Sequence, residues 1–439
     1  MAGGSLPIAV PTTSAVTTEK NKYLAPLVVL TSLFFMWGFL TCLNDVIIPH
    51  LKAVFDLNYA QAMMIQFAFF TAYFVVSLPS GLIVNKIGYK NGIIVGLLTA
   101  GAGCLMFYPA AGMRSYAMFL LALFILASGI TLLQVAANPF VAILGKPETA
   151  SSRLTLTQAF NSLGTTIAGP FGAAFILATT AKSAAELKAM APADVEAYRL
   201  VEASSVQGPY IGLAIALVLL AVAIALFKLP KIDAAGSDSL TSTTTEKRSA
   251  WGYRHLVLGA LAIFVYVGGE VAIGSFLVNY FKEPYIRGFT EAEGANYISF
   301  YWGGAMVGRF IGTATLRMFR PGKVLALHAF GAAALVVLTM LTTGSVAMWA
   351  ILAVGLFNSI MFPTIFTIAI DGLGRHTGQG SGILCMAIVG GALIPVLQGG
   401  LADRIGIHYC FIVPVLCYLY IAWYGLKGHP STQRAPVVA

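Results

Sequence analysis

The sequence predicts an all-α membrane protein with twelve transmembrane helices, arranged as two six-helix bundles. Of its 439 residues, 58% are hydrophobic and only 10% are charged, and the mean hydropathy is +0.83. A soluble protein of this length would carry about 25% charged residues. Apolar runs close to the length that crosses a bilayer recur along the whole chain. A polar stretch after the sixth run divides the chain into two halves.

The expected spans follow in order from these runs. They cover residues 24–50, 60–84, 91–111, 115–144, 152–178, 208–228, 254–281, 292–319, 322–342, 346–370, 378–400 and 408–427. Residues 1–23 lack the basic start and apolar core of a signal peptide, so we expect a flexible tail there. The predicted bundles are 24–228 and 254–427, with a linker at 229–253 and a second tail at 428–439.

Lysine and arginine predict the orientation, because cytoplasmic loops are enriched in them. Seventeen basic residues fall on the side that carries both termini and eight on the other, with Arg309 left inside a span. We therefore expect both termini in the cytoplasm. The net charge of +9 does not indicate nucleic-acid binding, because the basic residues are not gathered into a stripe with interleaved aromatics.

The cysteines and histidines argue against an enzyme or a metal protein. The five cysteines lie in or beside apolar runs, and neither they nor the six histidines show metal-ligand spacing. We expect no catalytic residue, no metal and no cofactor. A membrane sensor stays as a rival class, but it would be expected to carry a sizeable soluble output domain, which this sequence does not contain.

The first span contains a polar pair at membrane depth, Asn44 and Asp45, followed by four more apolar or small residues. A charge at this depth costs at least ~3 kcal/mol on insertion scales, so such residues usually face a cavity and carry function. The plainer alternative is that Asp45 reaches headgroup water from the end of the helix. We favour a functional site for a solute.

The two halves share a proline-containing helix at matching positions. Span four carries Asn138-Pro139-Phe140, and span ten carries Phe362-Pro363-Thr364. Paired, broken helices in two six-span halves are typical of transporters whose substrate site lies between the halves. In span eight Gly304, Gly308 and Gly312 recur every four residues, which predicts close helix packing.

Further polar side chains lie at membrane depth in the other spans. Gln134 and Asn138 are four residues apart, and Gln158 and Asn161 three apart, so each pair lies on one helix face. These amides suit a ligand with many hydroxyls, although amides also join helices in membranes. The remaining candidates are a second carboxylate and three aromatic side chains, namely Glu270, Trp37, Trp302 and Phe362. For Arg309 we expect a structural or gating role, as a partner for helix-end carbonyls or an acid.

Four motifs resemble the fucose/galactose/glucose permeases of the major facilitator superfamily, over residues 24 to 427. They are Leu43–Pro49, Ala136–Phe140, Gln158–Gly164 and Pro363–Phe366. Within that family the sequence is most similar to bacterial glucose/galactose transporters, with N-acetylglucosamine permeases as near relatives. The resemblance implies the two-bundle fold, alternating access, and cation-driven uptake of a sugar across the bacterial inner membrane. We expect the protein to be a monomer.

The sequence departs from the family in the position of one carboxylate. Fucose–proton symporters have Glu at the position of Gln134 and Gln at the position of Glu270, so the resemblance implies that the second carboxylate has changed helix. We expect Asp45 and Glu270 to serve proton coupling, with Glu270 also an acceptor for the sugar. The alternatives are a symporter for N-acetylglucosamine or fucose, a sodium-coupled hexose symporter, and an uncoupled facilitator. For Glu270 a purely structural pairing with Arg309 also stays open.

Overall fold

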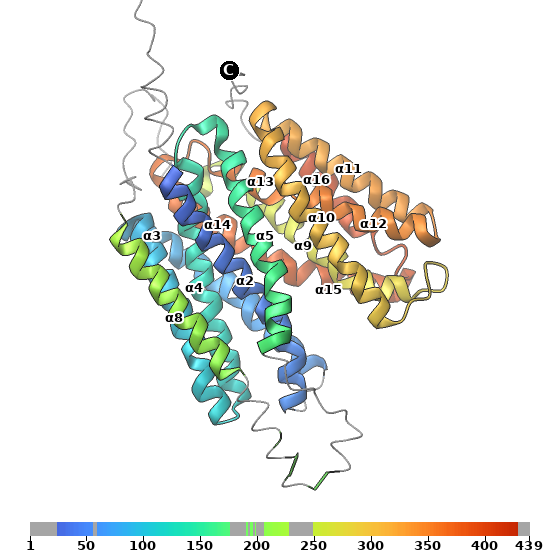
Figure 1. Cartoon of the computed structure of the whole chain (residues 1–439). Coiled ribbons are helices and arrows are strands. Elements are labelled where there is room, and N and C mark those ends of the chain that lie inside the picture. The colour runs from blue at the N-terminus through green and yellow to red at the C-terminus, as the bar shows by residue number, and fades with distance from the viewer. Residues whose placement is uncertain are drawn as a thin grey trace, which may run out of the picture.

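The computed structural model describes residues 24–55, 59–175, 206–227 and 249–428, with isolated positions between 190 and 198. The helices of the first half are α2 (Leu24–Phe55), α3 (Tyr59–Gly112), α4 (Tyr116–Ile143), α5 (Ala150–Phe175) and α8 (Gln207–Leu226). Those of the second half are α9 (Arg254–Lys282), α10 (Glu291–Met318), α11 (Pro321–Leu341), α12 (Gly344–Asn358), α13 (Met361–Ile370), α14 (Thr377–Met386), α15 (Gly390–Ile405) and α16 (Ile412–Lys427). Figure 1 shows the helices as two groups that lie side by side.

These helices supply the twelve predicted spans. α3 contains two spans that meet at Gly88, where φ is +81° and glycine is therefore favoured. α12 with α13, and α14 with α15, each form one span that is interrupted in the middle. In the described part of the chain, eight helices are long and apolar enough to cross a membrane on composition alone. α5 and α10 are not among them, because polar residues interrupt them, and α16 is a shorter apolar helix.

Some boundaries differ from the prediction. α2 continues through Pro49 to Phe55, past the expected end at residue 50. Residues 1–23, the linker up to residue 248 and residues 429–439 lie outside the described residues, so the predicted tails and linker stay predictions.

The two prolines that match between the halves behave differently. The predicted break in span four is wrong, because α4 stays helical through Pro139 to Ile143. Span ten does break, between the end of α12 at Asn358 and the start of α13 at Met361.

In both halves the proline removes the hydrogen bond to the carbonyl four residues earlier. The carbonyl freed by Pro139 is that of Val135, and it accepts a hydrogen bond from Ser381 Oγ at 2.8 Å. The carbonyl freed by Pro363 is that of Ser359, and it accepts one from Arg309 Nε at 3.2 Å. A donor from another helix therefore satisfies each carbonyl, both where the helix continues and where it breaks.

Glycines set the closest approaches between helices. A Cβ at Gly308 would lie 2.5 Å from the carbonyl oxygen of Leu356, and one at Gly312 would clash with Ile360. The glycine stripe of span eight therefore packs α10 against α12 and the break that follows it, as the spacing predicts. Within the first half, a Cβ at Gly164 would clash with the carbonyl of Phe35, so α5 and α2 also touch backbone to backbone.

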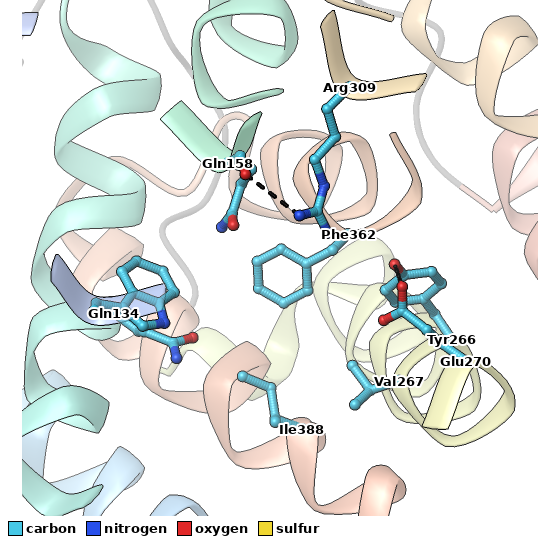
Figure 2. Close-up of a pocket in the computed structure, with 9 residues that line it drawn as sticks. Gln134, Gln158, Tyr266, Val267, Glu270, Arg309, Phe362 and Ile388 are labelled. Carbon is cyan, nitrogen blue, oxygen red and sulfur yellow. Dashed lines mark hydrogen bonds between the residues drawn. The ribbon is translucent and has the colours of Figure 1, made fainter. Parts of the chain in front are cut away.

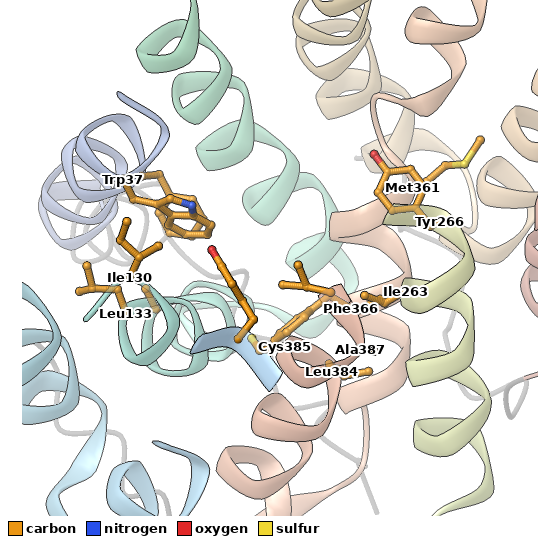
Figure 3. Packing of buried hydrophobic residues seen from close by; sticks show 14 of the residues in the cluster. Trp37, Ile130, Leu133, Ile263, Tyr266, Met361, Phe366, Leu384, Cys385 and Ala387 are labelled. Atoms are coloured by element: carbon orange, nitrogen blue, oxygen red, sulfur yellow. The ribbon is translucent and has the colours of Figure 1, made fainter. Parts of the chain in front are cut away.

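The two halves meet through polar contacts near one end of the helices, which we call the closed end. Ser151 Oγ and Thr367 Oγ1 are 2.6 Å apart, and Ser152 Oγ donates to the carbonyl of Thr313 at 2.7 Å. Gly81 of α3 packs against Gly378 of α14, so closely that a Cβ there would meet a carbonyl oxygen at 2.8 Å. Apolar side chains from both halves belong to one buried cluster, among them Trp37 and Phe366 (Figure 3).

Candidate functional site

A cavity of about 150 Å³ lies between the two halves (Figure 2). Side chains from both halves form its wall. They are Trp37, Gln134 and Gln158 from the first half, and Tyr266, Val267, Glu270, Arg309, Phe362 and Ile388 from the second. The wall thus combines amides, a carboxylate, a guanidinium and aromatic faces.

Two amides and an indole form the wall of the first half. Gln134 is buried on α4, and its Nε2 donates to the hydroxyl of Tyr73 on α3 at 2.5 Å. This bond fixes the amide plane of Gln134, so its other polar atom remains available to a ligand. Trp37 packs on Phe34 with ring centroids 4.6 Å apart, and its ring reaches the cavity.

A buried carboxylate with a tyrosine network forms the wall of the second half. Glu270 on α9 is 9% exposed and accepts a hydrogen bond from Tyr266, one turn earlier, at 2.8 Å. The same hydroxyl lies 3.1 Å from the carbonyl of Asn358, at the break in span ten. Asn358 Nδ2 donates to the hydroxyl of Tyr301 at 2.8 Å, and Tyr301 in turn donates to the main-chain carbonyl of Glu270 at 3.1 Å. The network holds Glu270 in place against the broken helix.

Arg309 joins the two halves at the cavity. Besides the carbonyl of Ser359, its guanidinium donates to the carbonyl of Gln158 at 3.3 Å (Figure 2). It also donates to the hydroxyl of Ser162, which like Gln158 lies on α5. The hydrogen bonds described for Arg309 therefore go to main-chain carbonyls and one hydroxyl, and Glu270 is a nearby charge. This placement favours the structural or gating role expected for Arg309.

The structure brings six of the predicted residues together at the cavity and leaves others apart. The six are Trp37, Gln134, Gln158, Glu270, Arg309 and Phe362. Asn161 lies elsewhere, with its amide donating to the carbonyl of Phe34 at 3.0 Å. Asn138 is fully buried below the cavity, and Trp302, 44% exposed, packs on Gly274 and Tyr301. For these three residues ligand contact stays a prediction.

The polar pair of the first span cannot be placed at the cavity. Residues 44 and 45 belong to α2, but the side chains of Asn44 and Asp45 lie outside the described part of the structure. Their roles in binding and coupling stay predictions.

Sequence reasoning missed four residues at or behind the wall. Tyr266, Val267 and Ile388 line the cavity, and Tyr73 holds Gln134. An apolar side chain facing a cavity has the same sequence signature as one packed in the core, so Val267 and Ile388 gave no signal. Tyr266 precedes Glu270 by one helical turn, and this spacing places the two side chains on one face.

The arrangement suits binding rather than bond-breaking chemistry. Amide and carboxylate groups can hydrogen-bond several hydroxyls, while Trp37 and Phe362 offer flat apolar faces to the CH groups of a ligand. Among the described residues no group of three or more His, Cys, Asp or Glu could hold a metal ion.

The chain matches the family model of the Major Facilitator Superfamily over residues 28–388. It is 57% identical to a glucose/galactose transporter of Brucella abortus over 97% of this chain and 99% of that protein. It is 37% identical to the L-fucose-proton symporter of Escherichia coli, over 92% of this chain and 93% of that one. A crystal structure of a fucose transporter of this superfamily in the outward conformation superposes with a TM-score of 0.85, at 35% identity, over 93% of this chain and all of that one. The chain therefore belongs to the major facilitator superfamily, and within it to the fucose/galactose/glucose permease family.

Proposed function

We propose that this protein imports a neutral hexose, glucose or galactose, together with a proton, by alternating access. The observation that carries the proposal is the cavity between the two halves, with amides on one side and a carboxylate on the other. The relatives are named as glucose/galactose and L-fucose-proton transporters, and the proposal extends those activities to this chain.

The wall favours a neutral sugar over a charged one. Gln134 and Gln158 face Glu270 across the cavity, and Arg309 is the single cation among the described residues that line it. Because Arg309 already donates to Ser359, Gln158 and Ser162, few of its donors are left for a phosphate or carboxylate.

Proton coupling needs an acid that is neutral in one part of the cycle and charged in another. A buried carboxylate carries its charge only where hydrogen bonds or an opposite charge compensate for lost hydration. For Glu270 these are the hydroxyl of Tyr266 and the nearby guanidinium of Arg309. We assign Asp45 as the proton carrier and Glu270 as the charged acceptor for the sugar, with the proton as the only coupling ion.

The same proposal covers topology and state. The protein is a multi-pass protein of the bacterial inner membrane, acts as a monomer, and has both termini in the cytoplasm, as the distribution of basic residues favours. The closed end then faces the cytoplasm, and the structure corresponds to an outward-facing state, like that of the fucose transporter.

The test is uptake of a panel of labelled sugars into proteoliposomes, with pH and sodium gradients imposed separately. We expect glucose or galactose to be accumulated when the outside is acidic, and sodium to have no effect. Better competition by sugar phosphates or uronic acids than by neutral hexoses would refute the substrate class. Preference for fucose or N-acetylglucosamine would replace glucose and galactose as the assigned substrate. Stimulation by sodium would replace the proton as the assigned coupling ion. Equilibration without accumulation would indicate a facilitator.

A further inference from the structure

Three buried polar side chains below the cavity have no hydrogen-bond partner among the described residues. Asn138 on α4 is 0% exposed, and neither its Nδ2 nor its Oδ1 is bonded. On α3 the hydroxyls of Ser77 and Ser80 are equally buried and unbonded. Buried polar groups are bonded in the large majority of cases, so a cluster of exceptions needs a physical reason.

The register of two helices places this cluster directly under the cavity wall. Asn138 lies one turn beyond Gln134 on the same face of α4, and Ser77 lies one turn beyond Tyr73 on α3. Gln134 and Tyr73 are themselves hydrogen-bonded, and both helices run from there toward the closed end. The unbonded groups therefore follow the cavity toward the closed end.

The same level is where the second half covers the first. The carbonyl of Val135, three residues before Asn138, accepts a hydrogen bond from Ser381 of α14. A Cβ at Gly382 would lie 2.6 Å from the carbonyl oxygen of Ser77. α14 thus lies over both α3 and α4 at this level.

The usual role of a polar residue in a membrane helix does not account for Asn138. Such residues join helices by hydrogen bonds or bond their own helix. Thr131, two turns earlier on α4, does the latter through the carbonyl of Ala127 at 2.8 Å. Asn138 does neither, although it offers two donors and an acceptor.

We propose that Asn138, with Ser77 beside it, forms a second sugar position that is used only when the closed end opens. This inference rests on the proposed function and names where the hexose binds before release to the cytoplasm. In the outward-facing state α14 keeps sugar and water out, and the amide stays unbonded. In the inward-facing state the amide hydrogen-bonds a sugar hydroxyl, so the inner and outer faces recognise the sugar through different residues.

The test compares half-saturation for hexose on the two faces, in right-side-out and inverted membrane vesicles. Asn138→Leu should raise the half-saturation on the inner face about ten-fold, which corresponds to about 1.4 kcal/mol. The outer half-saturation should stay within about two-fold. The control is Thr131→Val, on the same helix, which should change neither face.

Inhibition by the set of monodeoxy-glucoses at the inner face separates contact from a shift in conformation. Wild type should discriminate against the analogue that lacks the bonded hydroxyl, and Asn138→Leu should lose that discrimination. A shift in conformation alone would scale all analogues equally and would overturn the proposal. Equal weakening on both faces, or no change on either, would overturn it as well.

A second variant guards against misfolding of the first. Ser77→Ala removes one hydroxyl with little change in volume, and it should raise the inner half-saturation alone by a few-fold. If Asn138→Leu gives no folded protein and Ser77→Ala changes neither face, the proposal is wrong. Failure of the proposed function is distinguishable, because wild-type vesicles would then carry no hexose on either face.

Discussion

The hydrogen bonds of Ser152 at the closed end predict that its substitution changes the population ratio of the outward-facing and inward-facing states. Its hydroxyl donates to the carbonyl of Thr313 at 2.7 Å and accepts from Arg317 Nε at 3.2 Å, so both bonds cross from the first half to the second. Opening the closed end must break them. A neutral hydrogen bond contributes about 1 kcal/mol net and a charged one at least about 1.5. We use the lower value for Arg317, because its side chain is exposed.

Ser152→Ala should therefore destabilise the outward-facing state by about 2.5 kcal/mol relative to the inward-facing one. At tenfold per 1.4 kcal/mol, the population ratio should change by about 60-fold toward the inward-facing state. The matched control is Ser128→Ala, because the bond of Ser128 in the described part of the chain stays in its own helix, to the carbonyl of Phe124 at 2.7 Å.

The assay is double electron–electron resonance between spin labels at Lys146 and Arg320, which are exposed in loops of opposite halves at the closed end. Labelling needs a background without the five native cysteines. The long-distance population should grow in Ser152→Ala and stay at the wild-type level in Ser128→Ala. If the two distributions match while both proteins are folded, these bonds do not hold the closed end.

Three further predictions concern coupling, binding and packing. Asp45→Asn should abolish accumulation of hexose while sparing exchange of labelled for unlabelled sugar, which needs no net proton movement; a variant that still concentrates sugar would exclude Asp45 from coupling. Glu270→Gln should raise the half-saturation for sugar about ten-fold in binding assays, because bonds to a charged acceptor contribute roughly 1.5–3 kcal/mol against about 1 for an amide. Unchanged binding with a collapsed yield would make Glu270 a scaffold residue. Gly308→Leu should abolish the folded protein in size-exclusion chromatography, whereas Gly303→Ala, with open space around its Cβ, should not; normal folding of Gly308→Leu would contradict the close packing.

The spans and much of the cavity wall could be predicted from the sequence. Apolar runs mark the spans, and polar residues within those runs mark candidates for the wall. Gln134, Gln158 and Glu270 stand out for that reason, and the structure places all three at the cavity. Helical spacing also placed Asn138 and Asn161 on the faces of those glutamines. Spacing does not tell how far along the helix the cavity extends, and it ends before Asn138.

What the sequence could not supply depends on contacts between distant segments. The amide of Asn161 is used by the carbonyl of Phe34, where α5 and α2 touch, and no local pattern predicts that contact. The wrong break at Pro139 belongs to the same limit, because two prolines at matching positions give one local signal while only the second span breaks. The donors that satisfy the two freed carbonyls, Ser381 and Arg309, also come from distant segments.

At two contacts between helices, the hydrogen-bond acceptor is a main-chain carbonyl freed by a proline. Such an acceptor is present whatever side chain its residue carries. The oxygens that bond Ser381 and Arg309 are main-chain atoms of residues 135 and 359, and prolines four residues later leave them available. A substitution at 135 or 359 that fits the buried space therefore keeps the acceptor. Replacement of Pro139 or Pro363 by alanine would restore an N–H that competes for the same oxygen. In evolutionary terms, these two prolines should tolerate less divergence than the residues whose carbonyls they release.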